Sequence, residues 1–277
     1  MIRLRRSALY VPASNLRALD KARTLPADVV IVDLEDAVAP HDKDAARRNL
    51  ARLGKFPGET AVRINAADTP WHGADIEAVI ALRPNAVVLP KVLSAADVER
   101  CGERTDITIW PMMETARAVL AAYPIACAAA KTGPSALIMG TNDLAAELRV
   151  DLSADRAPMS DALSGCVLAA RAAGVDIIDG VTNDVRDDAR LEAEVEEGVR
   201  IGMDGKSVIH PRQIPIVNQA FSPDAGAVAA AKRVKDAVTA AGGGVAVLDG
   251  RMVEALHARA AERTLAMAEA IAWRAKA

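Results

Sequence analysis

The residues best suited to chemistry in this sequence are acidic and basic side chains that follow short apolar runs. The acidic residues are Glu35, Asp36, Glu114, Asp143 and Asp179, and the cationic residues are Arg63 and Lys91. Crowded carboxylates raise one another's pKa unless a cation neutralises them. An all-oxygen ligand set favours Mg²⁺ or Mn²⁺ over zinc, and Mg²⁺ needs only one or two carboxylates. These residues therefore indicate a metal-assisted catalyst.

Glu114 and Asp143 form the best pair for a metal, because they follow consecutive apolar runs. The preceding Gly140-Thr141-Asn142 indicates a loop that approaches another group closely. Arg63 offers a planar fork for a carboxylate or a developing oxyanion. Structural roles are the alternatives: Asp36 and Asp143 as helix caps, and Glu114 as an ion-pair partner.

Eight apolar runs are spaced along the chain so that they end at these residues. They are Ala8–Val11, Val29–Leu34, Ala61–Ile64, Ala86–Leu89, Ile107–Met112, Ala136–Met139, Val175–Ile178 and Lys206–Ile209. Such near-continuous runs are typical of parallel strands that are covered on both faces. Ala-rich amphipathic segments alternate with them. Ser14 and Ser94 each precede such a helical segment, and another runs from Ser160 to Gly174, which we expect to cap its C-terminus.

This alternation predicts an α/β protein with a (β/α)₈, or TIM, barrel, whose catalytic groups lie at the carboxyl ends of the strands. A doubly wound open sheet is the alternative, but no glycine-rich phosphate loop follows the first run. We expect the barrel to occupy residues 1–222 and a C-terminal helical extension, a lid or oligomer arm, residues 223–277. Within this last part we expect helices at Asp224–Ala241 and from Arg251 to about Ala275, after a shorter one at Gln213–Ala220.

The composition excludes several classes of protein. A net charge of −3 and an aromatic content of 3% argue against nucleic-acid binding. The most apolar stretch, Val119–Ala130, is too short for a membrane span and contains Pro124. The three cysteines form neither a disulfide framework nor a zinc motif. We therefore expect a cytoplasmic protein that binds neither membrane nor nucleic acid.

Several segments of the sequence resemble one known family in the same order along the chain. These segments are Ser7–Ala13, Lys21-Ala22, Ala27–Val38, Val62–Asn65, Leu89–Lys91, Met113–Thr115, Lys206–Ile214, Phe221–Pro223 and Asp249–Val253. They resemble citrate lyase β-subunit-like proteins of the HpcH/HpaI aldolase superfamily, which includes malyl-CoA and citramalyl-CoA lyases. The resemblance implies a TIM barrel whose C-terminal extension packs on a neighbouring subunit in a homotrimer or hexamer.

The resemblance also implies a role for individual residues. Mg²⁺ would be bound by Glu114, which also faces the substrate, and by Asp143. Arg63 would contact the substrate's oxyanion or carboxylate, and Tyr10 and Lys21 would face the coenzyme A (CoA) portion.

A further implied role falls on the C-terminal extension, where Asp249 would reach the active site of a neighbouring subunit. The sequence departs from many family members at two positions. Asn142 stands where many have Glu, and Arg149 stands where many have Gly. These differences leave the substrate open.

We expect a Mg²⁺-dependent lyase that cleaves a carbon–carbon bond in a 3-hydroxyacyl-CoA such as malyl-CoA or citramalyl-CoA. CoA is then part of the substrate and not a bound cofactor. Asp36, or Asp249 of a neighbour, would remove the hydroxyl proton, and Arg63 would stabilise the thioester enolate. Two alternatives stay open: a (3S)-malyl-CoA thioesterase, and a citrate lyase β-like subunit acting on a carrier-bound citryl thioester.

Overall fold

The computed structural model describes residues 2–276, which divide into two compact units. One unit is Arg5–Asn218, and the other comprises the described residues before Arg5 and after Asn218. The predicted boundary after residue 222 stays a prediction. Among the described residues, no helix combines the length and the apolar character needed to cross a membrane.

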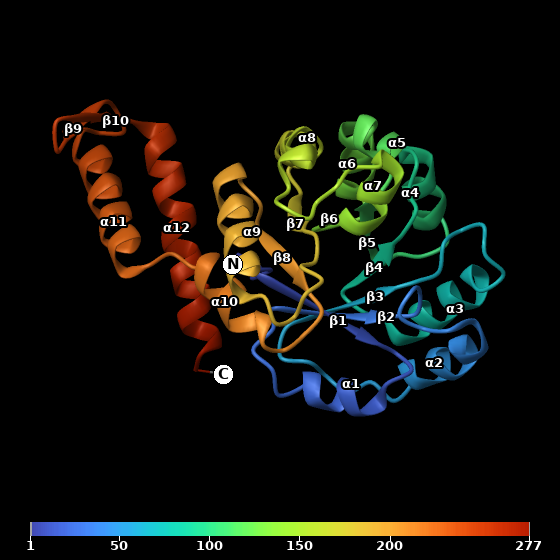
Figure 1. Ribbon diagram of the computed structural model, residues 1–277. Coiled ribbons are helices and arrows are strands. Elements are labelled where there is room, and N and C mark those ends of the chain that lie inside the picture. The colour runs from blue at the N-terminus through green and yellow to red at the C-terminus, as the bar shows by residue number, and fades with distance from the viewer. Residues whose placement is uncertain (1, 277) are drawn as a thin grey trace. The chain divides into compact units, whose positions relative to one another are not determined.

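The larger unit is a closed barrel of parallel strands, which confirms the predicted fold class and excludes the open sheet (Figure 1). Its strands are β1 (Ser7–Pro12), β2 (Val29–Asp33), β3 (Glu59–Arg63), β4 (Ala86–Leu89), β5 (Thr108–Met113), β6 (Ala136–Met139), β7 (Asp176–Asp179) and β8 (Gly205–Val208). Each strand pairs with the next, and β8 closes the barrel on β1, with Ser7 opposite Lys206.

Helices follow the strands and surround the barrel. They are α1 (Leu16–Ala22), α2 (Lys43–Leu50), α3 (His72–Leu82), α4 (Ala95–Gly102), α5 (Ala116–Leu120), α6 (Ala122–Ala130), α7 (Thr141–Leu148), α8 (Ser160–Ala173) and α9 (Asp188–Ile201). Ser94 caps α4 in a capping box with Asp97, and Gly174 ends α8 in the left-handed conformation, as their types predict. At α1 the cap is Asn15 and not Ser14, because the Asn15 side chain accepts the Ala18 N–H.

Strand alternation determines which side chains enter the barrel. The interior cluster contains Ala8, Ile31, Ala61, Trp110 and Ile138, each fully buried. Because side chains alternate between the two faces of a strand, the residues two positions further along also point inward. These are Tyr10, Asp33, Arg63, Met112 and Gly140, and all of them line one cavity at the carboxyl end of the barrel.

The smaller unit contains a helical hairpin and a short strand hairpin. Its elements are α11 (Ala225–Ala240), β9 (Ala246–Leu248), β10 (Arg251–Val253) and α12 (Ala255–Arg274), and α10 (Gln213–Ala220) precedes them across the boundary between the units. The predicted start of the last helix at Arg251 is therefore wrong: Arg251–Val253 form a strand, and the helix begins at Ala255. Asp249 and Gly250 both have positive φ (51° and 73°), which makes a two-residue turn that pairs Leu248 with Arg251.

Candidate active site

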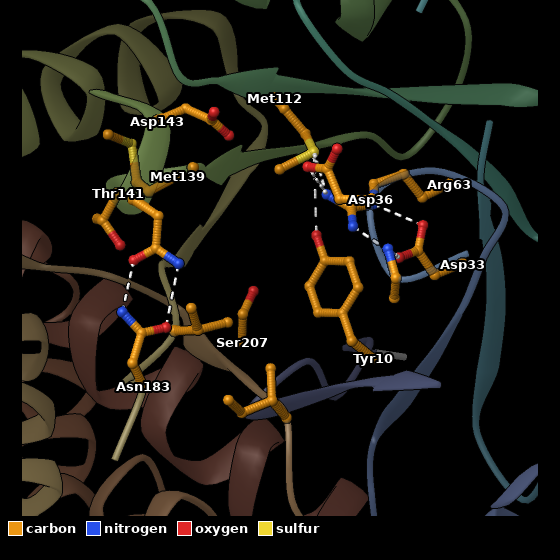
Figure 2. Close-up of a pocket in the computed structure, with 15 residues that line it drawn as sticks. Tyr10, Asp33, Asp36, Arg63, Met112, Met139, Thr141, Asp143, Asn183 and Ser207 are labelled. Carbon is orange, nitrogen blue, oxygen red and sulfur yellow. Dashed lines mark hydrogen bonds and ion pairs between the residues drawn. The ribbon is translucent and has the colours of Figure 1, made fainter. Parts of the chain in front are cut away.

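A cavity of about 430 Å³ opens at the carboxyl ends of the barrel strands. Its lining consists of Tyr10, Asp33, Asp36, Ala37, Arg63, Met112, Met139, Gly140, Thr141, Asn142, Asp143, Val181, Asn183, Ser207 and Ile209. Figure 2 shows Thr141 and Asp143 on one side of this cavity and Tyr10, Asp33 and Arg63 on the other. The cavity therefore presents a guanidinium and a separate carboxylate to anything bound inside it.

Arg63 is held rigidly by carboxylates. Its Nε and Nη2 donate to the two oxygens of Asp33 at 2.8 and 2.6 Å, and its Nη1 lies 2.8 Å from Glu35 Oε2. The guanidinium also stacks 5.0 Å from the centre of the Tyr10 ring. Burial opposes the charge of Arg63, but Asp33 and the neighbouring acids keep its pKa well above the usual value. Nη1, the nitrogen that Asp33 does not engage, lies beside Glu35 and donates to Met112 Sδ at 4.0 Å.

Asp33 is a residue that the sequence reasoning missed. Besides the Arg63 fork, it accepts the backbone N–H of Glu35 at 2.8 Å and that of Ala37 at 3.2 Å. One buried carboxylate thus joins the end of β2, the loop after it and the guanidinium from β3. The inward register of residues 29, 31 and 33 on β2 is the signal that would have identified it.

Glu35 is buried beside Arg63 without an aligned hydrogen bond from it: the ion pair at 2.8 Å leaves Oε2 with no hydrogen-bond partner. Burial raises the pKa of Glu35 to about 8, although the Arg63 charge opposes the rise. This carboxyl group therefore titrates near neutral pH.

A pH dependence of stability follows from Glu35. Since its pKa is raised from 4.5 to about 8 in the folded state, its contribution to stability is complete below about pH 4.5 and is lost as the pH rises through about 8. We expect the free energy of unfolding to fall across this window in the wild type and to fall less in Glu35→Gln. Urea denaturation at several pH values measures both slopes, and parallel curves for the two proteins would contradict the assignment.

The two predicted metal ligands lie around a single cation. Lys91 Nζ is 3.0 Å from Asp143 Oδ2 and 3.7 Å from Glu114 Oε1. Glu114 is 1% exposed, and its Oε1 also accepts the Lys91 backbone N–H. Burial raises the pKa of Glu114, while the Lys91 N–H and ammonium oppose the rise. Lys91 thus forms ion pairs with both acids.

The geometry of these two acids fits a divalent ion. Glu114 Oε2 is buried and has no hydrogen-bond partner, so this carboxylate oxygen is uncommitted. Among residues 2–276 no group of three or more His, Cys, Asp and Glu side chains converges on a metal position. A site with two carboxylates suits Mg²⁺, which keeps water or substrate oxygens in its other positions.

Gly140 is required by the close approach of Glu114. A Cβ at residue 140 would lie 2.4 Å from Glu114 Cβ and 2.7 Å from Glu114 Oε2, closer than atoms can pack. The predicted close approach of this loop is therefore to Glu114 itself.

We expect Gly140→Ala to push Glu114 aside, to destabilise the protein by about 1–3 kcal/mol and to weaken metal binding. Thermal unfolding and metal titration measure the two effects. Gly165→Ala is the matched control, because no atom lies within 4 Å of a Cβ at that position in α8. Equal behaviour of the two variants would show that the space beside Glu114 does not matter.

The other predicted residues have different positions. Tyr10 and Asp36 line the cavity, and Asp36 Oδ2 is 3.8 Å from Arg63 Nη1. Asp36 caps no helix, since α2 begins at Lys43. Lys21 lies exposed in the last turn of α1, outside the cavity lining. In the smaller unit Asp249 pairs with Arg233, with oxygens 2.5 and 2.6 Å from Nη2.

Asp179, grouped with the catalytic acids from the sequence, is a structural residue. It is fully buried and pairs with Arg156 at 2.8 Å and Lys206 at 3.1 Å. The reason is the register of β7: Ile178 points into the barrel, so Asp179 points toward the surrounding helices.

A pair of side-chain amides at the cavity joins helix α7 to the loop after β7, and the sequence did not predict this contact. Asn142 and Asn183 donate to each other's side-chain oxygens at 3.0 and 2.8 Å (Figure 2). The amide at position 142, noted as a departure from the family, thus links the first turn of α7 to the loop after β7.

Comparisons with known proteins cover almost the entire chain. The sequence profile of the HpcH/HpaI aldolase/citrate lyase family matches residues 6–211. The (3S)-malyl-CoA thioesterase of Cereibacter sphaeroides strain KD131 is 47% identical over 96% of this chain and 95% of the relative. The citrate lyase subunit beta of Escherichia coli strain K12 is 34% identical over 91% of this chain and 89% of the relative.

Among solved structures, CitE from Mycobacterium tuberculosis in complex with magnesium, acetoacetate and coenzyme A superposes with a TM-score of 0.80. It is 34% identical, and the match covers 96% of this chain and 100% of that chain.

The chain forms a closed parallel barrel, and a buried guanidinium and a pair of acids lie at its carboxyl end. This arrangement is typical of enzymes with the TIM-barrel fold. The chain belongs to the HpcH/HpaI aldolase/citrate lyase family. The resemblance that the sequence motifs indicated is confirmed.

Proposed function

We propose that this protein is a Mg²⁺-dependent hydrolase of a malyl-CoA-type thioester, with Mn²⁺ as a substitute ion. The observation that carries the substrate class is one cavity with Asp143 on one side and the Arg63 guanidinium on the other. Glu114 is buried outside the lining of this cavity and is linked to Asp143 through Lys91. A compact acid with a hydroxyl, a carboxylate and a thioester carbonyl can satisfy both sides at once. Hydrolysis is favoured over the expected carbon–carbon cleavage by the 47% identity to the thioesterase of Cereibacter sphaeroides.

The residues of the chain take the following roles in this proposal. Glu114 and Asp143 would hold the divalent ion, which would supply Lewis-acid chemistry to the bound substrate. Arg63 Nη1 donates to the thioester oxygen, on which negative charge develops during attack by water. Asp36 is the base: it lines the cavity and is 3.8 Å from Arg63 Nη1, so it reaches water near the carbonyl.

The proposal also covers the CoA portion of the substrate and the assembly of the subunits. Tyr10 and Lys21 lie along β1 and α1, which we assign to the CoA portion. We also propose that the protein is a cytoplasmic homotrimer or hexamer, in which Asp249 of one subunit reaches the active site of its neighbour as a second candidate base.

Carbon–carbon cleavage is the second candidate, because the same guanidinium and acid pair would serve it. In that reaction Asp36 would take the hydroxyl proton, and Arg63 would stabilise the enolate of the departing acyl-CoA. Both reactions would use the same two acids and the same arginine, so only analysis of the products distinguishes hydrolysis from carbon–carbon cleavage.

The test is incubation of the Mg²⁺-loaded protein with (3S)-malyl-CoA, followed by assays for free thiol, glyoxylate and acetyl-CoA. Hydrolysis releases malate and free CoA in equal amounts and no glyoxylate. Cleavage yields acetyl-CoA and glyoxylate without free thiol, and this result would replace the first proposal with the second. Turnover in neither assay, with metal bound, would overturn the substrate class.

A further inference from the structure

Lys91 has a backbone conformation that is unusual for a residue other than glycine. It follows β4 directly, and its φ of 53° lies in the left-handed region, which a residue other than glycine adopts at an energetic cost. With this backbone, both the N–H and the side chain of Lys91 reach the same acid: the N–H donates to Glu114 Oε1, and Nζ lies 3.7 Å from it. Strain of this kind persists where the surrounding structure holds the residue in place.

The ammonium of Lys91 is a counter-ion for both acids. It is 3.0 Å from Asp143 Oδ2, and its only ion pairs among the described residues are with Asp143 and Glu114. Burial opposes the charge of Lys91, but Glu114 and Asp143 raise its pKa above the usual value. Two carboxylates that converge on one position repel each other, and a cation between them removes most of that repulsion.

The ammonium lies within ion-pair distance of both acids that we assign to the divalent ion. Both acids that we assign to the metal point at Lys91 Nζ, and Glu114 Oε1 already receives the N–H of the same residue. A divalent ion at the same carboxylates would lie within contact distance of a like charge. The lysine side chain, which is 37% exposed, has room to leave.

We propose that Lys91 is the internal counter-ion of the metal site: its ammonium neutralises Glu114 and Asp143 in the metal-free protein and is displaced when the divalent ion binds. Its backbone N–H stays on Glu114 in both states and keeps that carboxylate oriented. This inference rests on the metal site of the proposed function. It adds that metal affinity in this protein is set by competition with a side chain of the protein itself.

The test compares Mn²⁺ binding by chelator-treated wild type, Lys91→Gln, Lys91→Arg and Lys131→Gln, with MnCl₂ as the probe and calorimetry as the readout. Lys91→Gln removes the competing charge and keeps the N–H, so we expect it to bind Mn²⁺ about tenfold more tightly. Lys91→Arg keeps the charge and is expected to stay near the wild-type affinity. Lys131→Gln makes the same change in net charge at an exposed lysine that pairs with Glu99, and is expected to match the wild type.

Thermal unfolding of the metal-free proteins supplies a second readout. Without the ammonium the two carboxylates repel each other, so metal-free Lys91→Gln is expected to melt below the wild type. Its melting temperature should then rise more on addition of MnCl₂.

The outcomes distinguish this inference from the metal site itself. If the wild type binds Mn²⁺ and Lys91→Gln binds it equally or more weakly, the counter-ion role is wrong while the metal site stands. If neither protein binds Mn²⁺, the metal site of the proposed function is wrong and the role of Lys91 falls with it.

Discussion

Glu114→Gln is expected to abolish turnover of the CoA ester and binding of the divalent ion, and to leave the barrel folded. The carboxylate has one buried oxygen with no hydrogen-bond partner, and this oxygen is the uncommitted ligand of the proposed site. Glutamine has the same shape and still accepts the Lys91 N–H, but it carries no charge for the metal. It also removes the cost of burying an ionised group, so stability should change little. We expect at least about a 10³-fold loss of kcat/KM, a size typical when a principal electrostatic contribution is removed.

Asp143→Asn should show the same loss, and Asp161→Asn is its matched control. Asp143 and Asp161 are both exposed acids in the first turn of a helix, α7 and α8 respectively. Only Asp143 contacts the ammonium that Glu114 shares. Wild-type turnover by Glu114→Gln or by Asp143→Asn would refute the proposal that these two acids hold a catalytic metal ion, whatever the family relationship implies.

Arg63→Met is expected to lower kcat by about 10²–10³-fold and to destabilise the fold by about 3–5 kcal/mol. The first effect comes from the loss of the donor for the thioester oxygen. The second arises because Asp33, which is fully buried, loses the fork that neutralises it. Steady-state kinetics and urea denaturation measure the two effects separately.

Arg156→Met separates the catalytic role of Arg63 from its structural role. Arg156 is another buried arginine, and it binds Asp179 and Glu197 outside the cavity lining. We expect it to destabilise the protein by a similar amount without the loss of kcat. Arg63→Lys keeps the charge but not the fork and should recover part of the stability and little of the activity. If Arg156→Met lowered kcat as strongly as Arg63→Met, the catalytic assignment of Arg63 would fail.

The positions of the strands were predictable because the signal for them is local. β4 and β6 coincide with the predicted runs, and the other six strands differ from theirs by at most two residues. Helix caps at Ser94 and Gly174 follow from the same local chemistry. The strand at Arg251–Val253 was missed although Asp249-Gly250 is a strong hairpin signal, because the apolar spacing around it also suits a helix.

The partners of the charged side chains depended on register and burial, which a list of strand ends does not contain. Asp179 ends a strand as the catalytic candidates do, but its outward register pairs it with Arg156 and Lys206. Asp33 was overlooked although its side chain points into the barrel. There it accepts a hydrogen bond from Arg63, which is 30 positions further along the chain.

The sequence alone predicted the eight-stranded alternation, the end of the barrel where the polar residues gather, and the proximity of Glu114 and Asp143, whose role as metal ligands stays a prediction. Hydrophobic periodicity and chain order are sufficient for these features, because parallel strands bring their carboxyl ends to one face. Only the tertiary structure decided that Lys91 lies between the two acids and that Gly140 touches Glu114. Both depend on the positions of atoms from three neighbouring strand ends, and on a left-handed backbone at a lysine for which local sequence has no signal.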